Sequence, residues 1–135
     1  ILNILKFKNS INTLIKIEDE EYLSNEYKGL LQYYKNLIRD EECLMIFTHE
    51  AALSYFFKKP TCSKYYLKYT ATPEIIQKRL IEDLREKTPN YIIYKSEIDI
   101  YQDSNKQRLY LVDNYIKRNY ILFEKYKHWE IYKIK

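Results

Sequence analysis

The stretch TPEIIQKRLIEDLREKTPNYIIY, residues 72–94, decides the fold class of this chain. Its Thr-Pro-Glu opening combines a helix cap, a proline suited to the first helical position and an acidic residue. Apolar residues then recur at helical spacing up to Pro89, which closes the helix; they are Ile76, Leu80 and Leu84. Residues 91–94 are aromatic or β-branched and predict a strand. A helix followed at once by a buried strand is the repeating unit of an α/β sheet.

The same alternation occurs upstream of this unit. The continuous apolar run 44–47 predicts a buried strand, and residues 51–57 predict a short helix. The aromatic run 65–69 predicts a second strand. Apolar residues at helical spacing predict a long first helix over 20–38, and residues 12–17 alternate partly, as a strand would.

Downstream, Ser104 and Gln107 are spaced as in a capping box, and an apolar helix face continues from there to Ile116. Residues 121–126 and 129–134 predict two strands joined by a tight turn. The sequence therefore predicts an α/β fold. We expect a three-layer sandwich with a mostly parallel central sheet and a C-terminal antiparallel hairpin at one edge.

A chain of 135 residues with one glycine and three prolines suits a single domain without a flexible linker. We expect residues 1–135 to form one soluble domain, with an α/β core over 20–135 and a membrane-proximal lead-in over 1–19. The chain starts at Ile1 rather than Met, so we expect it to be processed or part of something longer. It contains neither a signal peptide pattern nor an apolar run near the roughly 18 residues that span a bilayer.

Motifs for catalysis are absent from the sequence. The one glycine, Gly29, lies inside the first predicted helix, so phosphate-binding glycine loops in their usual forms are excluded. There is no nucleophile elbow. His49 and His128 lie far apart and the two cysteines lack ligand spacing, so we expect no metal and no cofactor in this segment.

The best generic pocket is the edge where parallel strands end, because open α/β sheets bind ligands there. The residues predicted to gather at this edge are Thr48, His49, Glu50, Tyr69, Thr70, Lys95 and Ser96. The ligand-binding candidates among them are His49, Glu50, Lys95 and Ser96. His49 could titrate near neutrality, and Glu50 could act as a base or accept a hydrogen bond from a sugar hydroxyl. We favour the simpler interpretation that Thr48 caps a helix and Glu50 complements its dipole.

The two cysteines leave two alternatives open. Cys43 precedes the first core strand, and Cys62 lies in the loop that leads into the second. In a parallel pair joined by a helix both positions fall at the same end of the sheet, so a disulfide is sterically reasonable. Two buried free thiols agree equally well with this spacing.

Several segments, taken in order, resemble a known module: Phe47–Ala52, Lys59–Tyr66, the helix after Pro73, Pro89–Tyr94, Tyr115–Tyr120 and Trp129–Tyr132. They resemble the soluble domain that follows the transmembrane helices in bacterial polytopic membrane proteins of the GT-C glycosyltransferase kind. Relatives of these proteins include the oligosaccharyltransferases and the protein mannosyltransferases. The resemblance covers roughly residues 37–135 and is one of pattern and order.

The resemblance implies a non-catalytic accessory domain on the periplasmic face of the bacterial inner membrane. It implies acceptor recognition or a cover over the membrane active site as the role. The partners would be the transmembrane part of the same parent chain and a polyprenyl-linked sugar or glycan acceptor. The family's catalytic acids lie in loops between membrane helices, so no catalytic residue is carried over. An oxidising periplasm would favour the disulfide between Cys43 and Cys62.

Two other functions compete with this one. A net charge of +4 and sixteen tyrosines are compatible with a nucleic-acid-binding module that stacks bases on aromatic rings. The basic residues are scattered, however, so we expect no nucleic acid partner. A stand-alone small α/β enzyme would use the strand-edge pocket, with His49 or Glu50 essential for turnover.

Overall fold

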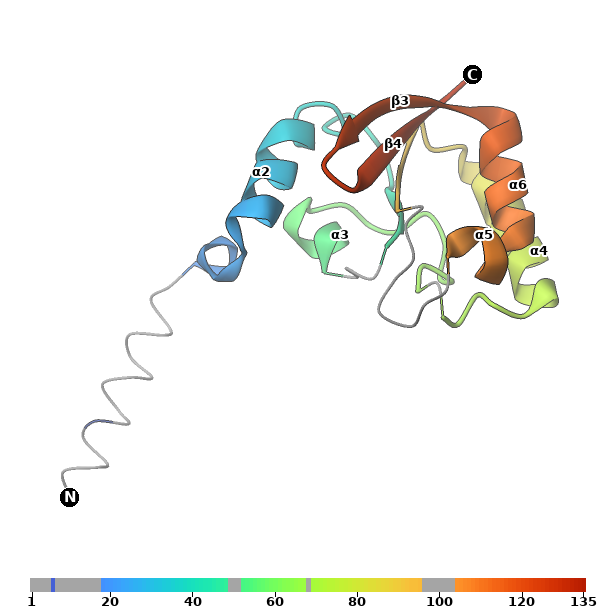
Figure 1. Ribbon diagram of the computed structural model, residues 1–135, viewed down its shortest axis with the longest axis horizontal. Coiled ribbons are helices and arrows are strands. Elements are labelled where there is room, and N and C mark those ends of the chain that lie inside the picture. Colours follow the sequence, from blue (N-terminus) through green and yellow to red (C-terminus); the bar gives the residue numbers. More distant parts are fainter. Residues whose placement is uncertain (1–5, 7–17, 49–51, 68, 96–103) are drawn as a thin grey trace. The chain divides into compact units, whose positions relative to one another are not determined.

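The computed structural model describes residue 6 and residues 18–48, 52–67, 69–95 and 104–135 (Figure 1). The chain forms two compact units, Ile1–Tyr34 and Lys35–Lys135. The sequence placed the start of the α/β core at residue 20, whereas the division lies after Tyr34. The predicted helix over 20–38 stops at this point, because residues 35–40 form turns.

The first unit contains a short 3-10 helix, η1 (Asp19–Tyr22), and the helix α2 (Asn25–Tyr34). The two are separate because Ser24 begins α2: its hydroxyl oxygen accepts a hydrogen bond from the backbone nitrogen of Tyr27 at 3.4 Å. The prediction of one continuous helix from residue 20 was therefore wrong. The strand predicted over 12–17 lies outside the described residues.

The second unit is built on a four-stranded sheet in the order β1-β2-β4-β3. The strands are β1 (Met45–Phe47), β2 (Tyr91–Tyr94), β3 (Tyr120–Tyr126) and β4 (Trp129–Ile134). β1 and β2 are parallel, whereas β4 is antiparallel to both β2 and β3. The α/β class and the C-terminal hairpin at one edge are thus confirmed. The sheet is mixed, so the expectation of a mostly parallel sheet was wrong.

The missing parallel strand is the one predicted over 65–69. The described residues of this segment form turns and a bend in place of a strand. Thr61, which precedes the segment, forms an isolated parallel bridge with Leu44. Tyr65 and Tyr66 pack, half-buried, against the core of the second unit. The aromatic composition of the segment therefore reflects packing against the core and not strand formation.

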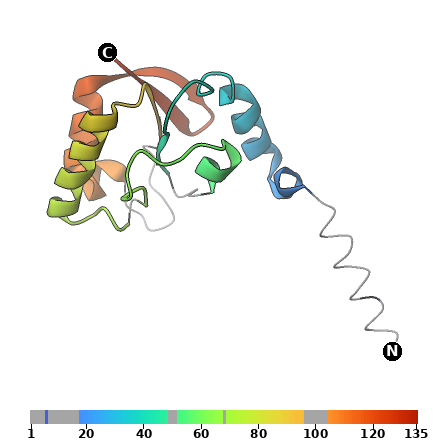
Figure 2. The ribbon, with the colours of Figure 1, turned by 180° about the vertical axis from the view of Figure 1, so that it is seen from behind.

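Helices lie on both sides of this sheet (Figures 1 and 2). α4 (Glu74–Lys87) and α6 (Tyr110–Asn119) lie side by side on one side, next to the one-turn helix α5 (Asn105–Arg108). The short helix α3 (Leu53–Phe56) lies on the opposite side. The three-layer arrangement predicted from the sequence is therefore present in the second unit.

The core lies between the sheet and the α4–α6 pair. Alternate strand residues face these helices, and each helix presents an apolar stripe to the sheet. The buried core residues include Met45, Phe47, Leu80, Leu84, Ile92, Tyr94, Val112 and Ile116. The intervening strand residues Ile46, Ile93 and Ile131 are also buried, on the opposite face. Burial of both faces explains why β1 and β2 read as continuous apolar runs in the sequence.

The ends of α4 and the start of α5 agree with the sequence prediction, except for the residue that caps α4. α4 begins at Glu74, one residue later than predicted, because Pro73 occupies the cap position. Thr72, the predicted cap, instead donates a hydrogen bond from its hydroxyl to the carbonyl of Tyr69 at 3.1 Å. Thr88 ends α4 in the left-handed region, at φ 40°. The capping box before α5 forms as predicted. Its two bonds run from Gln107 N to Ser104 Oγ at 3.3 Å and from Ser104 N to Gln107 Oε1 at 3.1 Å.

A buried carboxylate joins the segments that lead into the two parallel strands. Glu41 is 7% exposed and accepts hydrogen bonds from Asn90, from the backbone nitrogen at 2.9 Å and from the side-chain amide at 2.8 Å. Lys59 donates from Nζ to the carbonyl of Glu41 at 2.5 Å. These contacts fix the starts of β1 and β2 relative to each other.

Cys43 and Cys62 form a disulfide, with their Cα atoms 4.9 Å apart. The bond lies beside the Leu44–Thr61 bridge and ties the loop after α3 to the start of β1. Both cysteines are buried. The disulfide therefore holds the segment that follows α3 next to the start of β1.

We predict that removing this disulfide lowers the stability of the second unit. Its cysteines are 19 residues apart, and closing a loop of that size stabilises a fold by about 3 kcal/mol through the unfolded chain. Urea unfolding of Cys43→Ser/Cys62→Ser should give a lower midpoint than the oxidised native chain. The native chain unfolded in excess reductant should move to the same lower midpoint. Equal midpoints for all three samples would contradict the prediction.

Candidate functional site

The edge where β1 and β2 end is the place where the sequence predicted a pocket. Lys95 follows β2 there, and its backbone nitrogen donates to the carbonyl of Phe47 at 3.3 Å. Thr48 follows β1 and is 5% exposed. The candidates His49, Glu50 and Ser96 lie outside the described residues. Lys95 is thus the one ligand-binding candidate whose place the structure gives.

Tyr69 and Thr70 were expected at the same edge, but they belong to a turn and not to a strand. The hydroxyl of Thr70 donates to the carbonyl of Leu67 at 2.8 Å. The guanidinium carbon of Arg108 lies 4.9 Å from the centre of the Tyr69 ring. The contacts that these residues make are therefore those of the loop before α4, because the strand that was to carry them does not form.

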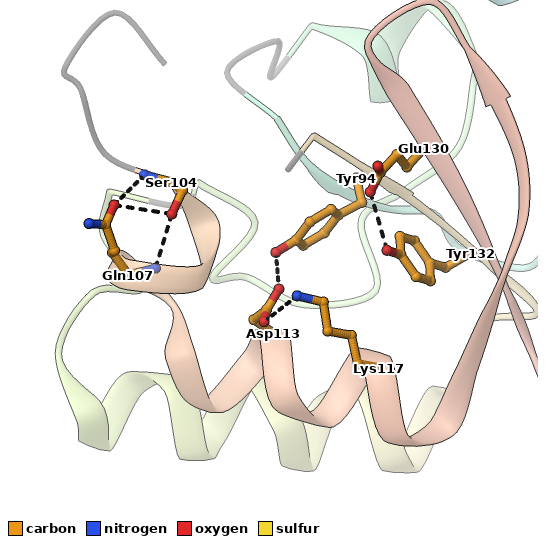
Figure 3. A network of polar contacts seen from close by, with 7 residues as sticks. All are labelled: Tyr94, Ser104, Gln107, Asp113, Lys117, Glu130 and Tyr132. Carbon is orange, nitrogen blue, oxygen red and sulfur yellow. Dashed lines mark hydrogen bonds and ion pairs between the residues drawn. The ribbon is translucent and has the colours of Figure 1, made fainter. Parts of the chain in front are cut away.

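Two tyrosine–carboxylate–lysine groups lie between the sheet and α6 and in the hairpin; Figure 3 shows them without Lys125, the lysine of the second group. In the first, the hydroxyl of Tyr94 donates to Asp113, whose other oxygen lies 2.7 Å from Lys117 Nζ. In the second, the hydroxyl of Tyr132 donates to Glu130 at 3.2 Å. The other oxygen of Glu130 lies 2.7 Å from the Nζ of the exposed Lys125. We refer to them as the Asp113 group and the Glu130 group.

Strand register brings the two groups together. Tyr94 is opposite Glu130 in the antiparallel pair of β2 and β4, and Tyr132 is opposite Ile92. All four side chains therefore share the face that α6 covers. The rings of Tyr94 and Tyr132 meet edge to face, with centroids 5.6 Å apart. On α6, Asp113 and Lys117 are one turn apart and face the same way.

Burial dominates the electrostatics of these phenols. It raises the pKa of Tyr94 above its ordinary value, and the hydrogen bond to Asp113 raises this pKa further. Burial raises the pKa of Tyr132 to about 12, and the nearby Glu130 carboxylate acts in the same direction. Burial likewise raises the pKa of Tyr120, whose hydroxyl donates to the carbonyl of Pro89 at 3.0 Å. All three are neutral hydrogen-bond donors at neutral pH.

The two groups are suited to fastening the fold. Asp113 is 4% exposed and Glu130 is 7% exposed, and a buried carboxylate is tolerated only when it is paired and hydrogen-bonded. Each has a tyrosine on one oxygen and a lysine on the other. The arrangement attaches α6 to β2 and β3 to β4, and it favours a structural role over acid–base chemistry.

The sequence reasoning missed these groups, although a signal for one was present. Asp113 lies next to Val112 and one turn after Leu109, on the apolar face of a predicted helix. A carboxylate at such a position requires a buried partner. Tyr94 could not be identified as that partner from the sequence, because its distance from α6 depends on the three-dimensional packing.

Among the described residues, no group of three or more His, Cys, Asp or Glu side chains is arranged to hold a metal ion. A cavity of about 350 Å³ lies at the opposite end of the sheet, where β1 and β2 begin, and its walls are residues 40–43 and 87–90. Of the helices in the described ranges, none has the length and apolar character to cross a bilayer.

We predict that Tyr94→Phe destabilises the fold far more than Tyr110→Phe. The two tyrosines each donate to a carboxylate, but Tyr94 is buried, whereas Tyr110 is 44% exposed and bonds to Glu74. Leaving one oxygen of the buried Asp113 carboxylate without its donor should cost about 1–3 kcal/mol. Urea unfolding of both variants measures the difference. Equal unfolding midpoints for the two variants would contradict the burial argument.

We also predict a two-step alkaline titration. An exposed phenol ionises near pH 10, whereas burial raises the pKa of Tyr94, Tyr120 and Tyr132, so these three should ionise only above that pH. A pKa that is higher in the folded state means that the native chain holds more protons, so stability falls as pH rises past 10. Absorbance at 295 nm and circular dichroism should show the late step coinciding with unfolding. A single step near pH 10 with the fold intact would be the opposite result.

The comparisons with known proteins bear on the fold. No family model and no curated protein matches the chain. A solved structure that is similar is the C-terminal globular domain of an oligosaccharyltransferase from Archaeoglobus fulgidus. The TM-score is 0.52 and the identity 14%, and the match covers 84% of this chain and 99% of that chain. The chain therefore has a fold similar to that of an oligosaccharyltransferase C-terminal globular domain.

Proposed function

We propose that this chain is the water-exposed C-terminal accessory domain of a bacterial polytopic membrane glycosyltransferase of the GT-C kind. The parent protein would transfer sugar from a polyprenyl-linked donor. The observation that carries the proposal is the similarity in fold to nearly the whole of an oligosaccharyltransferase C-terminal globular domain, 99% of that chain. The order of the segments from Phe47 to Tyr132 supports it independently of the fold.

The disulfide supports a periplasmic location for this domain. Buried structural disulfides persist in oxidising compartments and are rare in the cytosol. Cys43 and Cys62 account for both cysteines of the chain. A domain on the periplasmic face of the inner membrane would keep this bond.

The arrangement of the buried acids supports an accessory role. Asp113 and Glu130 are each held between a tyrosine and a lysine, which suits them to hold α6 and the hairpin in place. The transfer chemistry is then assigned to the membrane part of the parent. The domain would recognise the acceptor or cover the membrane active site.

Sugar transfer by the parent protein tests this proposal. Membranes that contain the whole protein would be compared with membranes that contain the protein without residues 35–135, using a polyprenyl-linked donor and its acceptor. The 135-residue chain alone is the control, and we expect no transfer from it. The expected result is that transfer depends on the deleted unit.

The kinetics also separate the two roles. Loss of acceptor recognition raises the KM for acceptor with little change in kcat. Loss of a cover lowers kcat and increases hydrolysis of the donor by water, because the site is no longer closed. Unchanged transfer after the deletion, or transfer by the 135-residue chain alone, would overturn the proposal.

A further inference from the structure

A groove of about 300 Å³ lies between α4 and α6, which run side by side (Figures 1 and 2). We call it the α4–α6 groove. Its lining residues are Ile81, Arg85, Leu111, Asn114, Tyr115, Arg118 and Asn119. The apolar and aromatic members are half-buried, whereas the arginines and asparagines are exposed. The groove thus has an apolar floor and a rim of hydrogen-bond donors.

The lining residues form one stripe on each helix. Ile81 and Arg85 are one turn apart on α4. On α6 the lining residues lie on a single helix face, because they are three or four positions apart: Leu111, Asn114, Tyr115 and Arg118. Two helices therefore each contribute one arginine to the same groove.

The two guanidinium groups leave the groove with uncompensated positive charge. Within the described part of the chain, neither Arg85 nor Arg118 forms an ion pair with a carboxylate. The guanidinium carbon of Arg85 lies 5.7 Å from the centre of the Tyr115 ring, which holds it over the groove by a cation–π contact. The described lining residues include no acid.

Helix dipoles explain this charge only in part. Both arginines lie in the last turn of their helices, where a cation is favoured. Lys87 and Lys117 occupy the same turns, yet Lys87 lines the cavity where β1 and β2 begin, and Lys117 pairs with Asp113. The dipole therefore does not account for two arginines that converge on one groove.

We propose that the α4–α6 groove binds a phosphate group, either free in solution or carried on a lipid. A guanidinium presents a planar fork of donors that matches two phosphate oxygens, so two arginines can hold a doubly charged group. The amide of Asn119 donates one hydrogen to the carbonyl of Tyr115 at 2.8 Å, which fixes it at the rim with a second hydrogen to offer. This inference does not depend on the proposed function.

Binding of inorganic pyrophosphate to the 135-residue chain tests the site. Arg85→Gln/Arg118→Gln should weaken binding by roughly tenfold or more, because it removes charged donors. The matched control is Arg39→Gln/Arg79→Gln, which removes the same charge from exposed positions outside the groove. We expect the control to bind within about twofold of the native chain, since distant exposed charges are screened by salt. Isothermal titration calorimetry gives the affinities, and thermal unfolding checks that both variants fold.

Vesicles distinguish a lipid-borne phosphate from a free one. Native chain that cosediments with phosphatidylcholine vesicles containing phosphatidic acid, but does not bind pyrophosphate, identifies the lipid as the source. Loss of vesicle binding should again be confined to the Arg85→Gln/Arg118→Gln variant. The proposal is overturned if the native chain binds neither probe, or if the groove variant and the control variant lose binding equally.

Discussion

The parallel pairing of β1 with β2 is the constraint on which the rest of this structure depends. Parallel neighbours need a long connection, and here residues 48–90 make it, with α3 on one side of the sheet and α4 on the other. Both faces of the two strands are buried as a result. β4 then adds to the free side of β2 in the antiparallel sense. A short turn at residues 127–128 lets β3 pair antiparallel with β4.

Polar contacts of a few buried groups hold the layers around this pair. Glu41 joins the segments that lead into β1 and β2, and the disulfide closes the first part of the connection onto β1. At the other end, Asp113 attaches α6 to Tyr94 at the end of β2. Removing a hydrogen-bond partner of Glu41 or Asp113 leaves a buried carboxylate oxygen without compensation, which costs more than the bond itself contributes.

The sequence predicted what short-range chemistry dictates. The bounds of β2, the Ser104 capping box and the hairpin follow from turn residues, caps and apolar spacing, and the structure has them. It did not predict the fate of residues 65–69, because aromatic residues that cover a core have the same composition as a strand. The buried carboxylate groups were missed because the pairing of Tyr94 with Asp113 is a product of tertiary packing. Of the predicted pocket, Lys95 can be placed, and His49, Glu50 and Ser96 lie outside the described residues.

The central claim is that this fold serves as one domain of a larger membrane glycosyltransferase. Its most direct test is the size and location of the native protein, detected in fractionated cells with an antibody raised against the 135-residue chain. The account predicts a species well above the 16.7 kDa of this chain that stays in the membrane fraction after extraction with alkaline carbonate. A species of about 16.7 kDa in the aqueous fraction would contradict it.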